Sequence, residues 1–274
     1  MELRQVAAVA GKEFRDRLRN RWVLAVALVF TVFAVVIAWF GGAQQGAVGL
    51  RSTEATIASL VSLVIYLIPL IALLLGFDAV VGERERGTLE LVLALPITRL
   101  ELLLGKYLGL AAALTASTLA GFGVVAGVLG AQAGRSALEP YAGFIAASVL
   151  LGLAFLSLAV LVSVLASDRA RASGLAIALW FFFVLVFDLL LLGLLVTTGG
   201  RMGDAAAAFP YLLLLNPADV FRILNVFSLE EVQNLYGLTG IVPAPLAKPW
   251  LMALVMLGWI AAPLAAAAWR FRSR

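Results

Sequence analysis

The sequence predicts an all-α, polytopic membrane protein with six transmembrane helices, an N-terminal interfacial helix and short amphipathic helices in two loops. Of its 274 residues 63% are hydrophobic and 13% charged, whereas soluble domains are about 45–50% apolar and about 25% charged. The apolar residues also gather in stretches of about 20, which is the length that crosses a hydrocarbon core of about 30 Å. A soluble enzyme, a disordered chain and a nucleic-acid binder are therefore excluded, despite a net charge of +4.

Six stretches have the length of a membrane span, so residues 1–274 are expected to form a single transmembrane domain. The expected spans lie at about 22–40, 57–81, 107–130, 144–166, 174–198 and 250–269. The two longest connections between these spans are 82–106, after the second span, and 199–249, after the fifth. Because the apolar run of the first span is too long for a cleaved signal peptide, we expect that span to remain in the mature protein.

Lysine and arginine are distributed unequally between the two sides of this predicted topology. One side receives 15 of the 20 basic residues, from the N-terminal segment, the second and fourth connections and the C-terminal segment. Basic residues accumulate in the cytoplasmic loops of membrane proteins. The chain is therefore expected to have both termini in the cytoplasm.

Residues 1–21 have the pattern of an amphipathic helix. Leu3, Val6, Ala10, Phe14 and Leu18 recur at spacings of three and four, and basic residues occupy the remaining surface. Such a helix lies in the membrane interface with its basic side towards anionic lipid headgroups. It is either a basic anchor or an elbow helix that also contacts a cytoplasmic partner, and the sequence leaves both open.

The second connection contains the run GERERGTLELVLALPITR, residues 82–99. Alternating charges lie between two glycines, Thr88 is suited to cap a short helix, and Pro96 ends it. This helix is too short to span a membrane and too apolar to remain free in water. It is therefore either a docking element for a partner or a solvated charge cluster that obeys the basic-residue rule.

This run, placed after the second of six spans, resembles the pattern of ABC-2-type permeases, the membrane subunits of one class of ABC transporters. In that family the segment is a coupling helix that inserts into a cleft of a separate ATPase. The resemblance implies ATPase contacts at Glu83, Arg84, Glu85, Arg86, Gly87, Thr88, Leu89 and Glu90. It also implies a second contact at the turn that contains Asp168, Arg169 and Arg171.

The chain has no phosphate-binding loop of its own. Gly-Lys occurs at 11–12 and 105–106, but neither pair has the glycine five positions earlier or the following Ser or Thr that the motif needs. ATP and Mg²⁺ are therefore expected on a partner ATPase, and no cofactor is expected in this chain. Because the sequence has neither Cys nor His, no metal site is expected either.

The connection at 199–249 carries a strong helix start. Asn216 is suited to the N-cap, Pro217 to the first helical position, and Asp219 to the positive end of the helix dipole. This helix either caps the bundle or forms a docking platform for a partner outside the cytoplasm.

Three segments together are similar to the permeases of nitrous-oxide reductase maturation systems. They are FGGAQQGAVGL after the first span, LIPLIALLLGFDAVVGERERGTL, and LLNPADVFRILN after the fifth span. The similarity implies a homodimer in the bacterial inner membrane, two cytoplasmic ABC ATPase subunits, a periplasmic β-helical partner protein and a copper-chaperone lipoprotein in the same pathway. The implied periplasmic docking region contains Asn216, Pro217, Asp219, Phe221, Arg222 and Asn225.

Two acidic residues lie nearest to the membrane interior, where a carboxylate needs a partner or water. Asp78 is expected at the cytoplasmic end of the second span, in a structural role, whereas Asp188 serves either an inter-helix hydrogen bond or a substrate pathway. An alternative function is thus a proton-coupled secondary transporter that uses Asp188 or Asp78. An intramembrane enzyme is disfavoured, because no catalytic set of residues stands out.

Without Cys or His, we expect the chain to transmit ATP-driven motion or pass a sulfur species rather than conduct copper.

Overall fold

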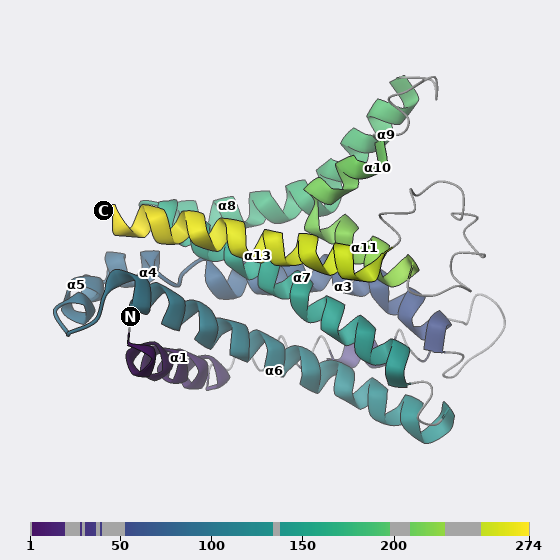
Figure 1. The fold of residues 1–274 in the computed structure, drawn as a ribbon, viewed down its shortest axis with the longest axis horizontal. Coiled ribbons are helices and arrows are strands. Elements are labelled where there is room, and N and C mark those ends of the chain that lie inside the picture. Colours follow the sequence, from purple (N-terminus) through teal and green to yellow (C-terminus); the bar gives the residue numbers. More distant parts are fainter. Residues whose placement is uncertain are drawn as a thin grey trace.

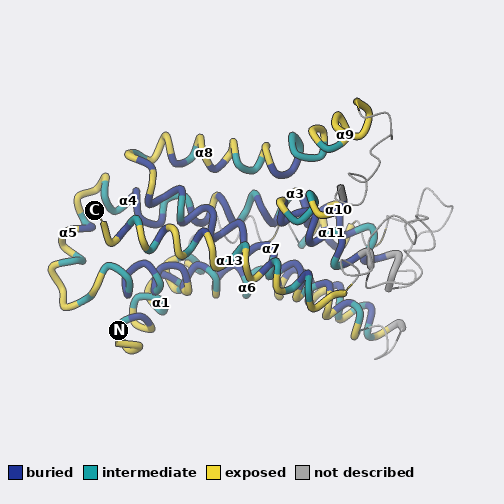
Figure 2. Tube along the Cα trace, turned by 45° about the horizontal axis from the view of Figure 1, so that its top comes forward, coloured by how far each residue is buried: buried dark blue, intermediate teal, exposed yellow. Residues whose placement is uncertain are grey.

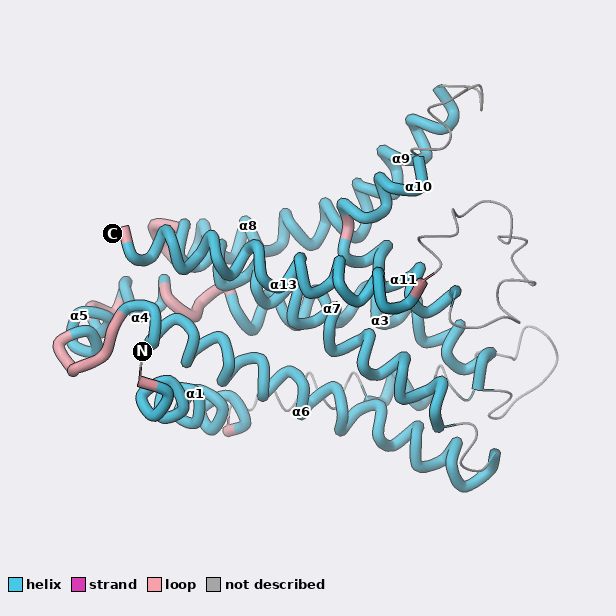
Figure 3. The backbone as a smooth tube through the Cα atoms, in the orientation of Figure 1, coloured by secondary structure: helices cyan, strands magenta, loops and turns pink. Residues whose placement is uncertain are grey.

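The computed structural model describes residues 2–19, 28, 31–36, 39, 53–133, 138–197, 209–227 and 248–273. Within these ranges the chain forms a bundle of long helices, with α1, α4 and α5 at one end and α11 at the other (Figure 1). No strand occurs among the described residues, and the all-helical fold class is therefore confirmed for that part of the chain (Figure 3).

Five described helices are long and apolar enough to cross a membrane. They are α3 (Thr53–Gly76) extended to the start of the second connection, α6 (Arg99–Ala133), α7 (Leu138–Leu165), α8 (Arg169–Phe181) continued through η3 (Phe182–Val186) into α9 (Phe187–Thr197), and α13 (Pro249–Arg272). They correspond to the second to sixth predicted spans. In the first predicted span, 22–40, only residues 28, 31–36 and 39 are described, and all of them are helical.

The shorter helices lie at the two ends of the bundle. At one end, which we call the charged end, are α1 (Leu3–Leu18), α4 (Val81–Glu85) and α5 (Thr88–Leu93), and both ends of the chain lie there too (Figure 1). Towards the other end are α10 (Phe209–Leu212), η5 (Leu213–Leu215) and α11 (Pro217–Phe227). The sequence also predicts a second short helix in this connection, at 229–236, and those residues lie outside the described ones.

The core of the bundle is built around α7, which packs against α3, α6 and α13. Leu151, Phe155 and Ala159 on α7 are completely buried. By contrast, the helix formed by α8, η3 and α9 is the least buried of the five span helices, and α9 projects away from the bundle (Figures 1 and 2). The large apolar side chains that α9 exposes fit a surface in contact with lipid.

The N-terminal helix α1 packs closely against the first turns of α6. A Cβ placed at Gly105 would lie 2.6 Å from the Cβ of Val9, and one at Gly109 would lie 2.6 Å from the Ala10 carbonyl oxygen. Small residues at a spacing of four allow helices to approach in this way. The buried face of α1 therefore differs from the predicted stripe, because Leu3 is 74% exposed whereas Glu13 is buried.

A capping box fixes the start of α6 and joins it to α1. The Thr98 hydroxyl accepts a hydrogen bond from the Glu101 N–H (3.2 Å), and the Glu101 carboxylate accepts one from the Thr98 N–H (2.9 Å). The other oxygen of that carboxylate accepts from the N–H of Glu2 at 2.5 Å. The third span helix consequently begins at Arg99, well before the predicted start at residue 107.

We expect the substitution Gly109→Leu to displace α1 from α6, because the added side chain overlaps the backbone of Ala10. Overpacking of this kind costs about 1–3 kcal/mol. The chain has no native Cys, so a single Val6→Cys probe in the contact reports displacement as an increased rate of thiol labelling. The matched control is Gly123→Leu on the same helix, where a Cβ would meet nothing within 4 Å. Equal labelling in both variants would contradict this packing.

Candidate functional site

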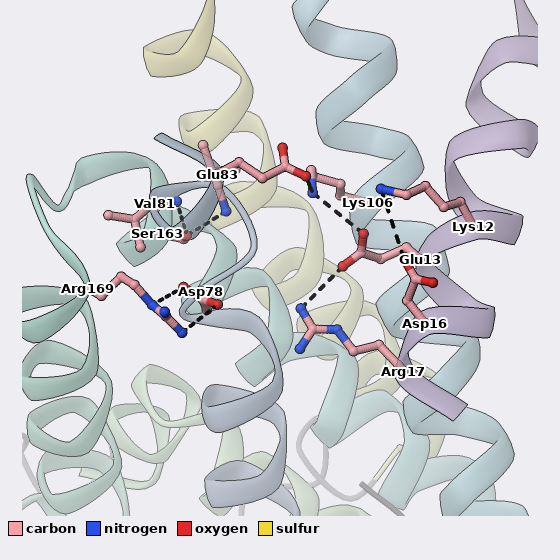
Figure 4. Close-up of polar contacts among 11 residues, drawn as sticks. Lys12, Glu13, Asp16, Arg17, Asp78, Val81, Glu83, Lys106, Ser163 and Arg169 are labelled. Carbon is pink, nitrogen blue, oxygen red and sulfur yellow. Dashed lines mark hydrogen bonds and ion pairs between the residues drawn. The ribbon is translucent and has the colours of Figure 1, made fainter. Parts of the chain in front are cut away.

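A buried lysine joins three elements at the charged end. The Lys106 ammonium on α6 lies 2.7 Å from Glu83 Oε1 on α4 and 3.5 Å from Glu13 Oε2 on α1 (Figure 4). The Lys106 side chain is only 4% exposed. Because a buried charge is tolerated only when it is paired and hydrogen-bonded, this ammonium holds α1, α4 and α6 in a fixed relation.

A second ion pair attaches the start of α8 to the same region. Arg169 Nε lies 2.7 Å from Asp78 Oδ1, and the guanidinium also donates to Asp78 Oδ2 at 3.0 Å (Figure 4). Asp78 lies in the turn between α3 and α4. The backbone N–H of Arg169 donates to Glu85 Oε1 at 2.9 Å. The start of α8 is therefore connected directly to α4 and to the turn before it.

Hydrogen bonds to α7 complete the fixation of α4. The Ser163 hydroxyl oxygen accepts from the N–H groups of Val80 (2.9 Å) and Val81 (3.1 Å), which begin α4. Arg84 donates to the carbonyl oxygen of Ala166 at 2.9 Å, just after the end of α7. Both contacts satisfy main-chain groups that helix termini leave without helical partners.

At both ends of the charged run, the structure explains why the residue is a glycine. A Cβ at Gly82 would overlap the carboxylate of Asp78. Gly87 has φ 69° and forms the left-handed junction between α4 and α5, a conformation that favours glycine. Gly87 also takes the N-cap position that the sequence suggested for Thr88, and the Thr88 hydroxyl instead donates to the Glu83 carbonyl oxygen at 3.3 Å.

The residues predicted to contact an ATPase divide into two groups. Glu83, Arg84 and Glu85 are engaged with α6, α7 and α8, and Leu89 is buried. The exposed members are Arg86, Gly87 and Glu90, together with Glu85 despite its contact with α8, while Thr88 is half-buried.

Sequence reasoning missed two apolar residues beside them, Leu91 and Leu95, which are 70% and 61% exposed. Leu91 lies in α5, whereas Leu95 lies in the turn after it, and their signal was an apolar run in a segment too short to bury all of its apolar side chains. We call Arg86, Glu90, Leu91 and Leu95 the α5 surface.

The turn predicted as a second contact exposes both of its arginines. Asp168 caps α8 by accepting from the Arg171 N–H at 2.8 Å. This hydrogen bond and a second one from the Ser167 hydroxyl hold the pKa of the Asp168 carboxyl below its usual range. Arg169 and Arg171 are both exposed, and Arg169 is also paired with Asp78.

At the opposite end, α11 begins as the sequence predicts. Asn216 is the cap, since its Oδ1 accepts from the Ala218 N–H at 3.0 Å, and Pro217 is the first helical residue. The residues predicted to dock a periplasmic partner nevertheless face the bundle. Asn216, Pro217, Asp219, Phe221 and Asn225 are buried, and Arg222 is partly exposed.

Asp188 forms an inter-helix ion pair, one of the two roles considered for it. Its Oδ2 lies 3.1 Å from the guanidinium of Arg222. Nineteen residues separate Asp188 from Arg169, which at about 1.5 Å per residue places Asp188 about 28 Å along the helix from the charged end. Asp188 is the second residue of α9, and the helix continues beyond it to Thr197.

No group of three or more Asp, Glu, Cys or His side chains suited to a metal ion occurs among the described residues. Met252 and Met256 are buried in the core of the bundle. Apolar packing accounts for both of them, as expected for methionine.

The family described as "ABC-2 family transporter protein" matches residues 7–274. The chain belongs to this family. It is 45% identical over 275 residues to a "Probable ABC transporter permease protein NosY" of Pseudomonas aeruginosa, covering 98% of both chains. It is also 43% identical over 280 residues to a protein of the same name from Stutzerimonas stutzeri, covering 99% of both. The chain is thus a membrane-embedded ABC transporter permease, and its charged end carries the segment that resembles a coupling helix.

We expect the variant Lys106→Met to destabilise this ABC-2 permease strongly. Removing the ammonium leaves Glu83 without its cation and Glu13 with Arg17 alone, and breaking a buried ion pair in this way costs about 3–5 kcal/mol. The measurement is thermal unfolding of the detergent-solubilised protein.

Lys12→Met is the matched control. Its ion pair with Asp16, at 4.0 Å, is largely exposed, and exposed pairs contribute about 0–1 kcal/mol. Similar unfolding temperatures for the two variants would show that Lys106 does not hold the charged end together.

Proposed function

We propose that this permease binds a separate ATPase at its charged end, through the α5 surface, and transmits the ATPase's movements across the bacterial inner membrane. The charged end is then cytoplasmic, in agreement with the distribution of basic residues. ATP and Mg²⁺ are bound by the ATPase, and the permease contributes no catalytic group.

The observation that carries this proposal is the two-sided character of residues 82–99. One side is fixed to α6, to the end of α7 and to α8 by an ion pair and hydrogen bonds. The other side exposes Leu91 and Leu95 beside the charged Arg86 and Glu90. A helix of six residues is not stable in isolation, so its rigidity comes from these attachments. A partner that moves α5 therefore also moves the helices attached to it.

The similarity to NosY proteins supports a role in the maturation of the copper–sulfide centre of nitrous-oxide reductase. In this proposal the permease is a homodimer with two ATPase subunits, and a periplasmic β-helical protein docks at the opposite end, with a copper-chaperone lipoprotein in the same pathway. A chain without Cys or His is poorly equipped to hold copper. We therefore propose that the permease transmits motion, or passes a sulfur species, and does not conduct copper.

The alternative function, proton-coupled secondary transport through Asp188 or Asp78, has less support. Each carboxylate is paired with an arginine, Asp188 with Arg222 and Asp78 with Arg169. A guanidinium remains charged at all physiological pH values, so a proton that binds either carboxylate must compete with it. In addition, Asp78 lies beyond the end of α3, in the turn before α4.

We expect Leu91→Asp to abolish co-purification of the ATPase while leaving the permease folded. Leu91 lies on the exposed side of α5, so the change introduces a charge into the proposed interface without affecting the internal network. The assay is affinity purification of the permease from membranes that contain the ATPase, followed by quantification of both chains.

Leu3→Asp on α1 is the control, since Leu3 is similarly exposed at the same end of the bundle. Replacing residues 83–86 with alanine is less informative, because Glu83, Arg84 and Glu85 stabilise the permease itself. Normal ATPase recovery and ATP hydrolysis with Leu91→Asp would refute the proposed interface.

A further inference from the structure

We propose that Asn216 and Arg222 are positioning residues that clamp α11 across a π-helical segment of span five, so that α11 follows the movement of this span. Span five here means α8, η3 and α9. The inference rests on the proposed function, because it assumes that movement of the charged end reaches span five. Through the contacts of Asn216 and Arg222 with span five, that movement reaches the opposite end of the bundle.

The first contact lies at the start of the π-helical segment η3. Asn216 Nδ2 donates to the carbonyl oxygen of Phe183 at 2.8 Å, although the two residues are 33 positions apart. π-Helical segments disturb the regular hydrogen-bond ladder, occur frequently at functional sites and cause kinks. Beyond η3, α9 leaves the bundle (Figure 1). The side chain of Asn216 therefore holds span five at its bend.

The second contact lies just beyond the π-helical segment. The guanidinium of Arg222 lies 3.1 Å from Asp188 Oδ2. The two contacts made by α11 thus lie on opposite sides of residues 184–187. A helix held on both sides of a bend cannot straighten there without breaking one of the contacts.

Within α11, the two clamp residues are joined by Asp219. Asn216 Nδ2 lies 2.9 Å from Asp219 Oδ2, and Arg222 donates to Asp219 Oδ1 at 2.6 Å. Asn216 and Asp219 are each 1% exposed, so the hydrogen bond between them is shielded from water. The clamp therefore behaves as one connected polar unit.

Aromatic packing fixes the surroundings of the first contact. The ring of Phe183 packs edge-on against Phe155 of α7 and Trp259 of α13, with centroids 5.8 and 5.6 Å apart. Trp259 Nε1 in turn donates to the carbonyl oxygen of Leu214, just before α11, at 3.0 Å. None of the residues of α9 is buried, so α9 is held mainly through Asp188 and its continuity with η3.

Span five therefore carries a polar attachment on each side of the membrane. Arg169 joins its first turn to Asp78 and Glu85 at the charged end. Asn216 and Arg222 join its bend to α11. A rotation or tilt of α8 that begins at Arg169 must either displace α11 or break the clamp, and breaking it would leave buried polar groups without partners.

The test uses Asn216→Ser, which retains an N-cap oxygen for Ala218 but is too short to reach Phe183. Asn225→Ala is the matched control, because Asn225 lies in the same helix, is also buried, and donates to Phe221 within α11. Spin labels are attached at Leu215→Cys and Val196→Cys, both exposed, in a chain without native Cys. Pulsed electron paramagnetic resonance then measures the distance between α9 and the start of α11.

In the purified permease alone, Asn216→Ser is expected to broaden the distance distribution, whereas Asn225→Ala leaves it narrow. With the ATPase bound, trapping with ATP and Mg²⁺ is expected to move α9 and α11 together in the parent chain and to shift their separation in Asn216→Ser. An unchanged distribution for Asn216→Ser without the ATPase would overturn the clamp. Since that measurement needs no ATPase, its outcome is distinguishable from a failure of the proposed function, which would appear as loss of ATPase binding by the parent chain.

Discussion

The arrangement of the charged end depends on one buried ammonium group. Lys106 belongs to α6, but its two carboxylate partners belong to α1 and α4. Removing a charge from water costs several kcal/mol unless the pairing is good, so these helices cannot separate independently of one another. The exposed α5, joined to α4 through Gly87, is consequently a rigid extension of the bundle. That property is what a partner ATPase needs in order to move the membrane helices.

The bundle combines a well-packed core with one loosely held span. Around α7 the helices interdigitate closely, whereas α8 and α9 expose much of their surface. Span five is connected to the core by specific polar contacts. They lie at Arg169 and Asp78 near one end, at Trp180, whose Nε1 donates to the Tyr66 carbonyl oxygen at 2.9 Å, and at Asn216 and Arg222 near the other end. A helix held in this way can change its orientation with little loss of apolar packing. This is the route that we propose for the transmission of movement from the charged end to α11.

The sequence predicted the features that depend on local patterns. Hydropathy predicted the five span helices that the structure describes, and capping rules predicted that α11 starts at Pro217 after Asn216. The missed features depend on contacts between distant residues. The Arg84 guanidinium donates to the carbonyl oxygen of Ala166, 82 positions away, so the charged run alone did not reveal that Arg84 faces inward. Glu13 and Lys106 looked like ordinary surface charges for the same reason. The early start of α6 was missed because the capping box of Thr98 and Glu101 was read as part of a loop.

The most direct test of a rigid charged end is the distance between α1 and α5 during the ATPase cycle. Spin labels at Ala8→Cys and Ala94→Cys, on α1 and directly after α5, would be measured in the complex with the ATPase, without nucleotide and trapped with ATP and Mg²⁺. Our account predicts that this distance stays constant, while the distance from Ala94 to a label at Leu215 changes. A nucleotide-dependent change between Ala8 and Ala94, with a constant distance to Leu215, would contradict it.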